Sequence, residues 1–347
     1  MSAPRVAVIG CGLTGSFTAL ILRRALPEAS VTVWEKSTNA GRTFTKRTAD
    51  SSIDMGAQYI SQTPEYAEAH KRFYSELLDQ GILSPFCGVI EGESRSDKAK
   101  NFVAPKGMDS IVNYCVAASG CSVLYNTRLE KLSVADDGMI KMLTLKSENG
   151  YVASYNAVVI TIPVPQALAL DGVLELLDKK PILKKNLECV HYSSRYAVAL
   201  HFESDFEIPV PWTAKYVCGN DAIRFVCWDS RKRNPQSGGP HSLLVHSSVP
   251  FAVEHLEEER AKVEETLIDR VQMLFSWLPK PTWSRCHRWR YSQVKQSYSG
   301  IPGYVTIGQS PPLLFGGDGF NHSNFDGCVE SAVQIVNALS KMPILSL

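Results

Sequence analysis

A glycine-rich turn between a short strand and a helix constrains the fold of this chain more than any other feature. The apolar, β-branched run Arg5–Ile9 is followed at once by Gly10-Cys-Gly12-Leu-Thr-Gly15. Residues 16–26 then carry apolar side chains at helical spacing, and Ser30–Trp34 is a second β-branched run. This order of strand, helix and strand predicts a right-handed crossover within a parallel sheet.

The spacing of the glycines indicates a site for the phosphates of a dinucleotide. Gly10 suits the tight turn, Gly12 lets a pyrophosphate approach the backbone, and Gly15 lets the helix pack closely on the strand. The helix N-terminus attracts phosphates through its free N–H groups and its dipole. Glu35 ends the second strand, 20 residues after Gly15, where a carboxylate can accept hydrogen bonds from ribose hydroxyls.

Composition excludes several other classes of protein. A length of 347 residues predicts two domains of about 150 residues each, and 36 Lys and Arg against 35 Asp and Glu argue against nucleic acid or an anionic membrane as a partner. The nine cysteines have no zinc-ligand spacing, so we expect free thiols in a reducing compartment and no metal site. No signal peptide and no run of about 20 apolar residues is visible, which predicts a cytoplasmic location.

The rest of the chain predicts one further parallel strand and then a different kind of domain. Residues 157–162 form an apolar strand that stops at Pro163-Val-Pro165, where we expect the chain to cross into a second domain. Between residues 167 and 283 the pattern predicts helices on an antiparallel sheet, with strands at 196–202, 215–218, 223–229 and 243–248 and a charged helix at 256–278. Other predicted elements are helices at 66–81, 107–119 and 325–341, a strand at 121–125, a hairpin at 128–145 turning at 136–138, and strands at 304–308 and 313–315. The cluster Arg231-Lys-Arg233 is interpreted as part of a solvated loop.

NAD and FAD sites share the glycine pattern, and the residues that follow it favour FAD. Gly41-Arg42 and Ile53-Asp-Met-Gly-Ala-Gln-Tyr59 resemble the flavin-containing amine oxidase superfamily. In that superfamily the Gly-Arg step borders the FAD diphosphate, and the Asp-x-Gly-Ala segment brings backbone up to the isoalloxazine. Arg42 suits this place because its planar guanidinium can pair with two phosphate oxygens.

The C-terminal part of the chain carries the other half of the same pattern. Gly316-Gly317-Asp318 follows an apolar strand, and Ser323-Asn324-Phe325 opens a helix. The resemblance implies that Asp318 approaches the ribityl chain and that the helix N-terminus faces N1 and O2 of the flavin. A helix N-terminus stabilises negative charge there by about 0.3–1 kcal/mol. An ordinary helix cap by Ser323 or Asn324 is compatible with this role.

The chain as a whole is similar to the renalase family. The similarity is carried from end to end by motifs such as Met55-Gly-Ala-Gln-Tyr-Ile60, Asn101-Phe-Val-Ala-Pro105, Tyr192-Ser-Ser-Arg-Tyr-Ala197, Trp289-Arg-Tyr-Ser-Gln-Val294 and Gly316-Gly-Asp-Gly-Phe320. Two departures are minor: Ala40-Gly41 stands where a double glycine is usual, and Glu35 stands where an aspartate can occur.

This resemblance implies an α/β plus α+β fold, in which an FAD-binding Rossmann-like domain accompanies a mixed-sheet substrate domain, as in p-hydroxybenzoate hydroxylase and monoamine oxidase. The FAD-binding domain is predicted at residues 1–75, 98–163 and 286–347, and the substrate domain at 76–97 and 164–285. The residues predicted to contact FAD, held without a covalent bond, are Gly10, Gly12, Thr14, Gly15, Glu35, Lys36, Gly41, Arg42, Gln58, Tyr59, Gly317, Asp318, Asn324 and Phe325.

Renalase-type enzymes oxidise the 2-dihydro and 6-dihydro isomers of NAD(P) to NAD(P)⁺ by hydride transfer to flavin N5, and O₂ is then reduced to hydrogen peroxide. The resemblance therefore implies these dinucleotides and O₂ as small-molecule partners, with Tyr59, Arg224, His246 and Trp289 lining the catalytic pocket. We expect no nucleic-acid or membrane partner and a monomer or weak homodimer. Export without a signal peptide occurs in the renalase family, so the resemblance leaves secretion open.

Two alternatives remain open from the sequence. One is an amine oxidase of catecholamine-type substrates, a chemistry that generally uses a lysine linked through water to flavin N5. The other is a secreted signalling protein that retains an FAD-binding fold. Each pocket residue also has an ordinary structural role open to it: Trp289 as core, His246 as a hydrogen-bonded buried imidazole, and Arg224 as a surface residue of a strand.

Overall fold

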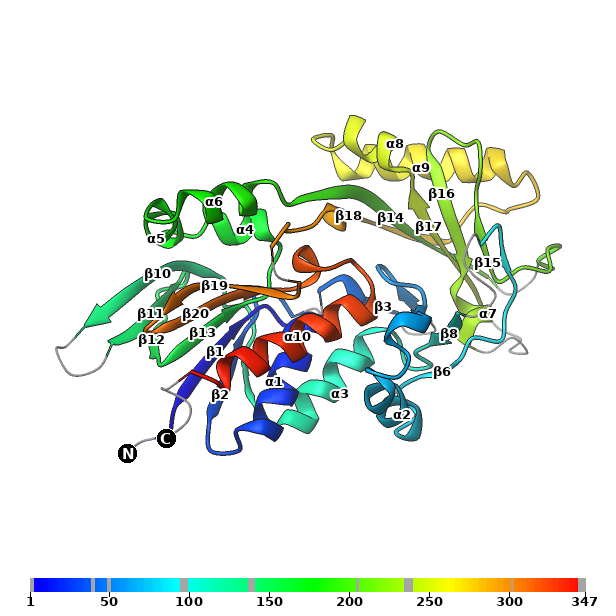
Figure 1. Ribbon diagram of the computed structural model, residues 1–347. Helices are drawn as coiled ribbons and strands as arrows, with labels where there is room; N and C mark the ends of the chain where they lie inside the picture. Colours follow the sequence, from blue (N-terminus) through cyan, green and yellow to red (C-terminus); the bar gives the residue numbers. More distant parts are fainter. Residues whose placement is uncertain are drawn as a thin grey trace. The chain divides into compact units, whose positions relative to one another are not determined.

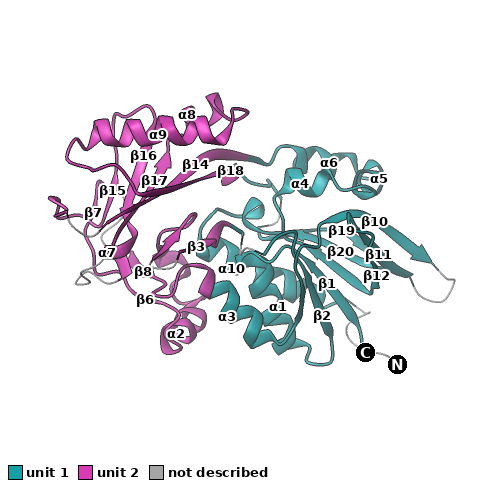
Figure 2. Ribbon diagram, turned by 180° about the vertical axis from the view of Figure 1, so that it is seen from behind, with its two compact units in different colours: residues 1–41, 111–191, 294–347 teal, residues 42–110, 192–293 magenta. Residues whose placement is uncertain are grey.

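The computed structural model describes residues 3–38, 41–48, 51–93, 99–136, 141–203, 206–233, 240–300 and 302–342. The chain divides into two compact units, shown in different colours in Figure 2. Unit 1 contains residues 1–41, 111–191 and 294–347, and unit 2 contains residues 42–110 and 192–293.

Unit 1 is built on a six-stranded sheet. Its strands, in spatial order, are β19 (Tyr304–Gln309), β20 (Pro312–Gly316), β13 (Ala157–Ile160), β1 (Arg5–Ile9), β2 (Ser30–Trp34) and β9 (Ser122–Leu124). β1 pairs in parallel with both β2 and β13, and β19 pairs antiparallel with β20. The parallel crossover predicted from the opening residues is confirmed.

Helices cover one face of this sheet and a smaller sheet lies on the other (Figure 1). The covering helices are α1 (Leu13–Ala25), α3 (Asp109–Ser119) and α10 (Phe325–Leu339). Leu22 of α1, Val112 of α3 and Ile335 of α10 share one apolar core with the strands. The smaller antiparallel sheet consists of β10 (Leu129–Asp136), β11 (Lys141–Ser147) and β12 (Val152–Tyr155).

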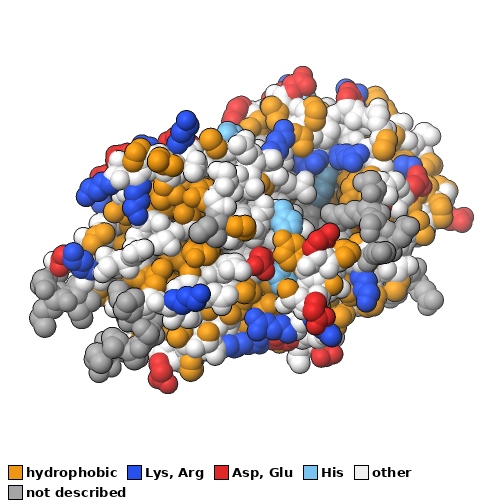
Figure 3. Space-filling view, viewed as in Figure 1, with side chains coloured by type: hydrophobic (Ala, Val, Ile, Leu, Met, Phe, Trp, Pro, Cys, Tyr) orange, Lys and Arg blue, Asp and Glu red, His pale blue; other side chains and the backbone are white. Residues whose placement is uncertain are grey.

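Three short helices follow β13 within unit 1: α4 (Val164–Leu168), α5 (Val173–Asp178) and α6 (Pro181–Glu188). Together with the small sheet they leave several large apolar side chains exposed, including Leu174, Ile182 and Val134. Apolar side chains accordingly gather over this region in Figure 3.

Unit 2 is built on a second six-stranded sheet. Its strands, in spatial order, are β18 (Trp283–Gln296), β14 (His191–Phe202), β17 (His241–Ser247), β16 (Ile223–Trp228), β15 (Ala214–Tyr216) and β7 (Ile90–Glu91). Pairing of β17 with β14 and β16 is antiparallel, as predicted. The helices of unit 2 include α2 (Lys71–Asp79), α7 (Asp229–Arg233), α8 (Val249–Glu254) and α9 (Arg260–Leu274). Two small sheets complete the unit. In one, β3 (Thr45–Arg47) pairs with β4 (Ser52–Asp54), and in the other β8 (Lys100–Val103) pairs with β5 (Ile60–Gln62) and β6 (Ser84–Pro85).

The alternation of side chains along β14 separates two cores in unit 2. Tyr196 and Val198 point into a core that α9 shares, whereas Ala197 and Ala199 point to the opposite face. On that opposite face the small alanine side chains leave room for Ile53 and Met55. The segment predicted to lie beside the flavin therefore packs on one face of the large sheet.

Most predicted helices and strands are present with shifted ends. The helix predicted at 66–81 begins at Lys71, after a 3₁₀ turn at Pro64–Tyr66. The charged helix predicted at 256–278 is the shorter α9. A separate helix, α8, precedes it and begins where the Ser248 hydroxyl accepts the backbone N–H of Phe251. Part of the turn predicted at 136–138 lies outside the described residues.

Two expectations differ from the structure. β18 was missed as a strand because its many arginine, histidine and glutamine side chains obscure the apolar alternation. The chain also passes from unit 1 to unit 2 after His191 and not at Pro163-Val-Pro165, because α4–α6 belong to unit 1, where Lys180 donates to the carbonyl of Ile307. Residues 42–75 and 98–110 likewise belong to unit 2, so the compact units divide the chain differently from the predicted domains.

Candidate functional site

In unit 1 the glycine-rich turn leaves the backbone at the start of α1 accessible. A Cβ atom added at Gly15 would lie 1.9 Å from the carbonyl oxygen of Gly10, so glycine is required for the helix to pack on the strand. At Gly12, where φ is −86°, an added Cβ would have no atom of the described residues within 4 Å. The turn therefore fits the approach of a phosphate to the backbone at Gly12.

The first turn of α1 has neither an acidic residue nor a side-chain cap. Thr14 is buried there, and its carbonyl accepts the hydroxyl of Thr18. The first turn of the helix thus carries no acidic side chain or side-chain cap of its own, and it suits an anionic group.

Glu35 lies at the carboxyl end of β2, beside the same turn. Its carboxylate accepts the backbone N–H of Cys11 at 2.9 Å through one oxygen, and the N–H and hydroxyl of Ser37 through the other. Burial, followed by the charge of Glu35, raises the pKa of the Cys11 thiol to about 12. The buried carboxylate is held in place to accept ribose hydroxyls, while the neighbouring Lys36 is exposed.

The second half of the unit 1 site follows β20. Gly317 adopts a φ of 116° and donates its N–H to the hydroxyl of Ser331 at 2.7 Å, and the buried Asp318 accepts the hydroxyl of Ser323 at 2.5 Å. Asn324 caps α10 by accepting the N–H of Gly327 at 2.7 Å. The ordinary capping role considered for Asn324 is therefore present.

The parallel sheet brings the two halves to one edge. Thr161, which follows β13, donates its hydroxyl to the carbonyls of Ile9 and Gly10, and a Cβ added at Gly317 would lie 3.3 Å from the Thr161 carbonyl oxygen. At the start of the helices, the ring of Phe325 meets Phe17 edge-on at 5.5 Å. Gly12, Glu35 and Asp318 are thus held at one edge of the sheet in unit 1, as the sequence predicts.

Arg42 is the first residue of unit 2, next in the chain after Gly41 of unit 1. A Cβ added at Gly56 would lie 1.9 Å from the Arg42 carbonyl oxygen, which accepts the N–H of Ala57 at 3.0 Å. The Arg42 guanidinium donates to the carbonyl of Ser292 at 3.2 Å. The Gly56–Ala57 backbone is therefore packed directly on Arg42.

Gln58 is buried and fixed by its neighbours in unit 2. Its amide nitrogen donates to the carbonyls of Asp54 and Gly56, at 2.5 and 3.0 Å, and its amide oxygen accepts the Lys232 ammonium at 2.9 Å. With both ends of the amide engaged, Gln58 holds the Asp54–Gln58 backbone in one conformation.

A buried ion cluster behind Gln58 was missed from the sequence. The Lys232 ammonium lies 2.8 Å from Asp54 and 2.7 Å from Asp229, and Arg233 also pairs with both carboxylates. The interpretation of residues 231–233 as a solvated loop is wrong, because they form α7 and the Lys232 side chain is 1% exposed. The spacing of Asp229 from Lys232 and Arg233 was the available signal, whereas Asp54 could not be paired from sequence.

The residues predicted to line the pocket share one region of unit 2. The hydroxyls of Tyr59 and Tyr216 lie 2.7 Å apart, and the guanidinium of the exposed Arg224 lies 5.4 Å from the Tyr216 ring centre. The ring centre of His246 lies 5.9 Å from that of Phe225, which packs on Tyr216 in turn.

Trp289 and His246 meet at the backbone of Met55. The Trp289 indole N–H donates to the Met55 carbonyl at 2.7 Å, and the Met55 backbone also lies beside the His246 imidazole. Burial, followed by the charge of Arg195, lowers the pKa of His246 to about 3, so this imidazole is neutral at physiological pH. Its buried Nε2 has no hydrogen-bond partner among the described residues.

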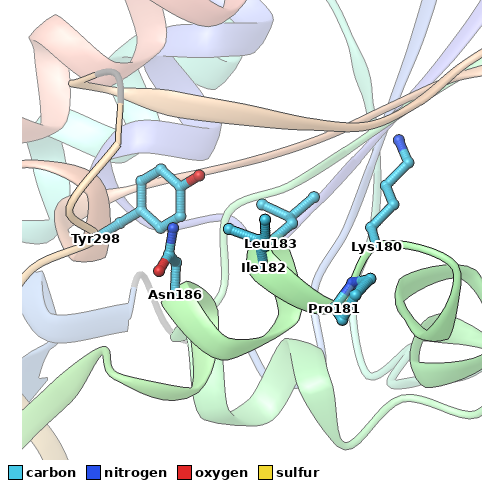
Figure 4. A pocket seen from close by; sticks show the side chains of 6 residues that line it. All are labelled: Lys180, Pro181, Ile182, Leu183, Asn186 and Tyr298. Atoms are coloured by element: carbon cyan, nitrogen blue, oxygen red, sulfur yellow. The ribbon is translucent and has the colours of Figure 1, made fainter.

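A shallow pocket of about 350 Å³ also lies within unit 1 (Figure 4). Pro181, Ile182 and Leu183 supply apolar surface, and Figure 4 shows Asn186 beside the ring of Tyr298. The Lys180 side chain points away, since its ammonium donates to the carbonyl of Ile307 at 2.8 Å. The pocket is therefore mainly apolar and lacks the phosphate-binding features of the glycine-rich turn.

The fold of these units is shared with oxidoreductases of known structure. It is similar to a protein from Exiguobacterium sp. 255-15 assigned as a protoporphyrinogen oxidase, with a TM-score of 0.73, 15% identity and coverage of 98% of this chain and 99% of that one. It is also similar to an engineered putrescine oxidase, with a TM-score of 0.68, 12% identity and coverage of 97% and 98%. The predicted fold class is confirmed.

Sequence comparison then gives the family. Residues 78–340 match the profile of flavin containing amine oxidoreductases, and residues 8–77 match that of an NAD(P)-binding Rossmann-like domain. Renalase from Mus musculus is 36% identical over 345 residues, covering 97% of this chain and 99% of that protein. The chain belongs to the flavin-containing amine oxidoreductases and, within them, to the renalase family.

The chain is therefore an oxidoreductase whose cofactor is FAD. The open backbone at Gly12, the uncapped start of α1 and the held Glu35 carboxylate fit the diphosphate and ribose of that cofactor. Within the described ranges, no helix has the length and apolar character needed to cross a membrane.

Proposed function

We propose that this FAD-dependent oxidoreductase converts the 2-dihydro and 6-dihydro isomers of NAD(P) to NAD(P)⁺ and produces hydrogen peroxide from O₂. Similarity to renalase supports the proposal, and the residues of unit 2 supply its chemical argument. When bound, FAD supplies the hydride acceptor and passes the electrons on to O₂.

The observation that carries the proposal is the combination of aromatic rings with a neutral imidazole in unit 2. Tyr59, Tyr216 and Trp289 offer flat apolar surfaces, and His246 stays neutral because burial lowers its pKa to about 3. A dihydropyridine loses hydride without a coupled proton loss, so its oxidation requires orientation and not a general base. These residues therefore suit a dihydronicotinamide ring.

Lys232 supports this choice over an amine oxidase mechanism. The Lys232 ammonium donates to the amide oxygen of Gln58 at 2.9 Å and is ion-paired with Asp54 at 2.8 Å and with Asp229 at 2.7 Å. Because this lysine is 1% exposed and held by two carboxylates and an amide oxygen, we do not assign it the role of the lysine that holds a water at flavin N5.

The cofactor contacts proposed for the individual residues follow from the two local geometries. In unit 1, Gly12 and the start of α1 hold the diphosphate, Glu35 the ribose, and Asp318 the ribityl chain. In unit 2, Arg42 pairs with the diphosphate and the Gln58–Tyr59 backbone borders the isoalloxazine. We propose that binding is noncovalent, with the buried Cys328 serving as part of α10.

Anaerobic mixing of the flavin-loaded protein tests the proposal. We expect 2-dihydro- and 6-dihydro-NAD(P) to bleach the visible flavin band within one turnover, and ordinary NADH and a monoamine to do so far more slowly. On admission of O₂, NAD(P)⁺ and hydrogen peroxide should form in equal amounts. Rapid bleaching by the monoamine, with no bleaching by the isomers, would establish the amine oxidase alternative instead.

A further inference from the structure

Two arginines lie on either side of the same end of β17. Ala197 of β14 and Phe225 of β16 both pair with His246 in the central strand. Arg195 lies two residues before Ala197 and donates to the carbonyl of Ser247 at 2.9 Å. Arg224 lies where the register of β16 shifts between residues 223 and 225. Adjacent strands lie about 4.8 Å apart, so the β14 and β16 backbones on either side of β17 are about 10 Å apart, and two long arginine side chains can reach one small anion across that distance.

Tyr216 and the β16 bulge place the Arg224 guanidinium. The Arg224 guanidinium lies 5.4 Å from the Tyr216 ring centre and donates to the carbonyl of Val217 at 3.3 Å. The register shift of β16 lies at the end of β17 where Arg195 donates to the Ser247 carbonyl, so both arginine side chains start from the same end of the sheet.

Neither arginine has a carboxylate partner within the described part of the chain. The single side-chain hydrogen bond of each goes to a backbone carbonyl, Ser247 for Arg195 and Val217 for Arg224. Other arginines of unit 2 are paired, for example Arg233 with Asp54 and Arg290 with Glu257. Each guanidinium has five N–H donors, so most of the donors of this pair are not used by residues that the structure describes.

The cost of holding these two charges together also points to an anion. Arg195 is partly buried, and burial, followed by the neighbouring charge of Arg224, lowers its pKa. Glu93 accepts the Tyr59 hydroxyl and the amide of Asn101, both at 3.4 Å, and does not contact either arginine. A phosphate accepts several N–H donors at once and would offset the repulsion between the guanidinium groups.

We propose that Arg195 and Arg224 together bind a phosphate group of the dinucleotide substrate, with the Ser247 carbonyl positioning Arg195 and Tyr216 positioning Arg224. This inference rests on the proposed function, because the aromatic residues beside the pair, Tyr59 and Tyr216, suit the flat rings of the same ligand. It gives a specific role to Arg224, which the resemblance places only in the wall of the catalytic pocket, and it adds Arg195, which was not among the predicted site residues.

Equilibrium binding of NAD⁺, the unreactive product, tests the proposal with the flavin-loaded protein. Titration calorimetry would compare the parent with Arg195→Gln, Arg224→Gln and the control Arg270→Gln, whose guanidinium makes an exposed pair with Asp221 at 3.7 Å. A charge-assisted hydrogen bond contributes about 1.5–3 kcal/mol, so we expect each of the first two variants to weaken NAD⁺ binding about ten- to a hundredfold. The control should bind within about twofold of the parent.

Two further probes distinguish a substrate-phosphate site from a general structural role and from a site for free anions. A 1-methyl dihydronicotinamide isomer, which has no phosphate, should reduce the flavin equally well in parent and variants. Equal losses for this compound and for NAD⁺ would overturn the proposal in favour of a general structural role. Inorganic pyrophosphate should bind far more weakly than NAD⁺; if it binds equally tightly and is lost in the same variants, the site is one for free anions.

The binding measurements distinguish a failure of this inference from a failure of the proposed reaction. If the dihydro isomers fail to reduce the parent flavin, the proposed function fails, while NAD⁺ and pyrophosphate binding still report on the arginines. If the isomers react normally and both arginine variants bind NAD⁺ as the parent does, the inference alone is wrong. Arg224 is exposed, so Arg224→Gln carries the test even if Arg195→Gln lowers stability.

Discussion

Replacing Lys232 with methionine should destabilise unit 2 strongly. The Lys232 side chain is 1% exposed and is bonded to Asp54, Asp229 and Gln58. Methionine fills a similar volume but removes one positive charge from a cluster of two carboxylates and two cations. One buried negative charge is left without compensation, and Gln58 loses the donor that fixes its amide oxygen.

The size of the effect follows from the burial of the pair. Removing one partner of a buried ion pair costs about 3–5 kcal/mol, whereas exposed pairs contribute about 0–1 kcal/mol. Lys262→Met is the matched control, since Lys262 is 71% exposed and pairs with Glu258 at 3.0 Å on a helix of the same unit. For a domain of this size, 1 kcal/mol corresponds to about 2–4 °C in melting temperature. We therefore expect Lys232→Met to lower the transition of unit 2 by about 6–20 °C and the control by less than about 4 °C.

The pH dependence of stability should show whether the Asp54 carboxylate is stabilised by its charged neighbours. Burial by itself would raise the pKa of Asp54, but the charges of Lys232 and Arg233 outweigh it and hold that pKa below its usual value. The stability contributed by this carboxylate is thus present above the pKa of the unfolded chain and is lost as pH falls through the folded pKa. Without Lys232 the pKa should rise, so the variant should recover part of its deficit by taking up a proton as the pH falls from about 7 to about 5.

Differential scanning calorimetry of the flavin-loaded protein at several pH values would measure both effects. Adding Asp229→Asn to Lys232→Met restores charge balance between Asp54 and Arg233, and it should regain part of the lost stability. A Lys232→Met variant that melts with the parent, or a deficit that grows on acidification, would refute the assignment of this cluster as a compensated ion network.

Other predictions follow from the same structure. Gly12→Ala should leave the melting temperature of the flavin-free protein nearly unchanged but lower the amount of flavin bound per protein, measured by absorbance. Gly15→Ala should lower both the melting temperature and the bound flavin. If the two variants have equal effects, the proposed approach of a phosphate at Gly12 is wrong. With Ellman's reagent, the exposed Cys218 should react in the folded protein, and Cys227, whose pKa burial raises to about 12, should react only after unfolding. Trp289→Phe removes the indole donor to a backbone carbonyl and should lower the free energy of unfolding by about 1 kcal/mol in denaturant titrations; an unchanged midpoint would argue against that hydrogen bond.

The candidate site in unit 1 could be predicted because each of its parts is local in sequence. Gly10, Gly12 and Gly15 lie within one turn, and the parallel strand order carries Glu35 to the same edge. Gly317 and Asp318 follow another strand of that sheet, so the same rule brings them to that edge. In a parallel sheet the carboxyl ends of the strands lie at one edge. Ligands bind beside that edge where the connections of neighbouring strands run to opposite faces of the sheet.

The unit 2 contacts depend on pairs that no local pattern joins. Asp229 accepts the backbone N–H of Asp54, 175 residues earlier, and Lys232 reaches Gln58 across 174 residues. The sequence predicted Gln58 and Tyr59 as contacts of FAD. It placed Lys232 in a solvated loop, because a run of basic residues is usually exposed. Burial of this lysine becomes favourable only when two distant carboxylates and an amide oxygen are folded around it.

By itself, then, the sequence determined the edge of the sheet that suits the phosphates of a dinucleotide, since this depends on backbone conformation within short segments, and its resemblance to the flavin-containing amine oxidases indicated FAD. The tertiary structure decided which charges are paired. It buried Lys232 between Asp54 and Asp229, and it left Arg195 and Arg224 beside β17 without carboxylate partners among the described residues. Charge pairing of this kind is set by strand register and long-range packing, which one-dimensional spacing does not encode.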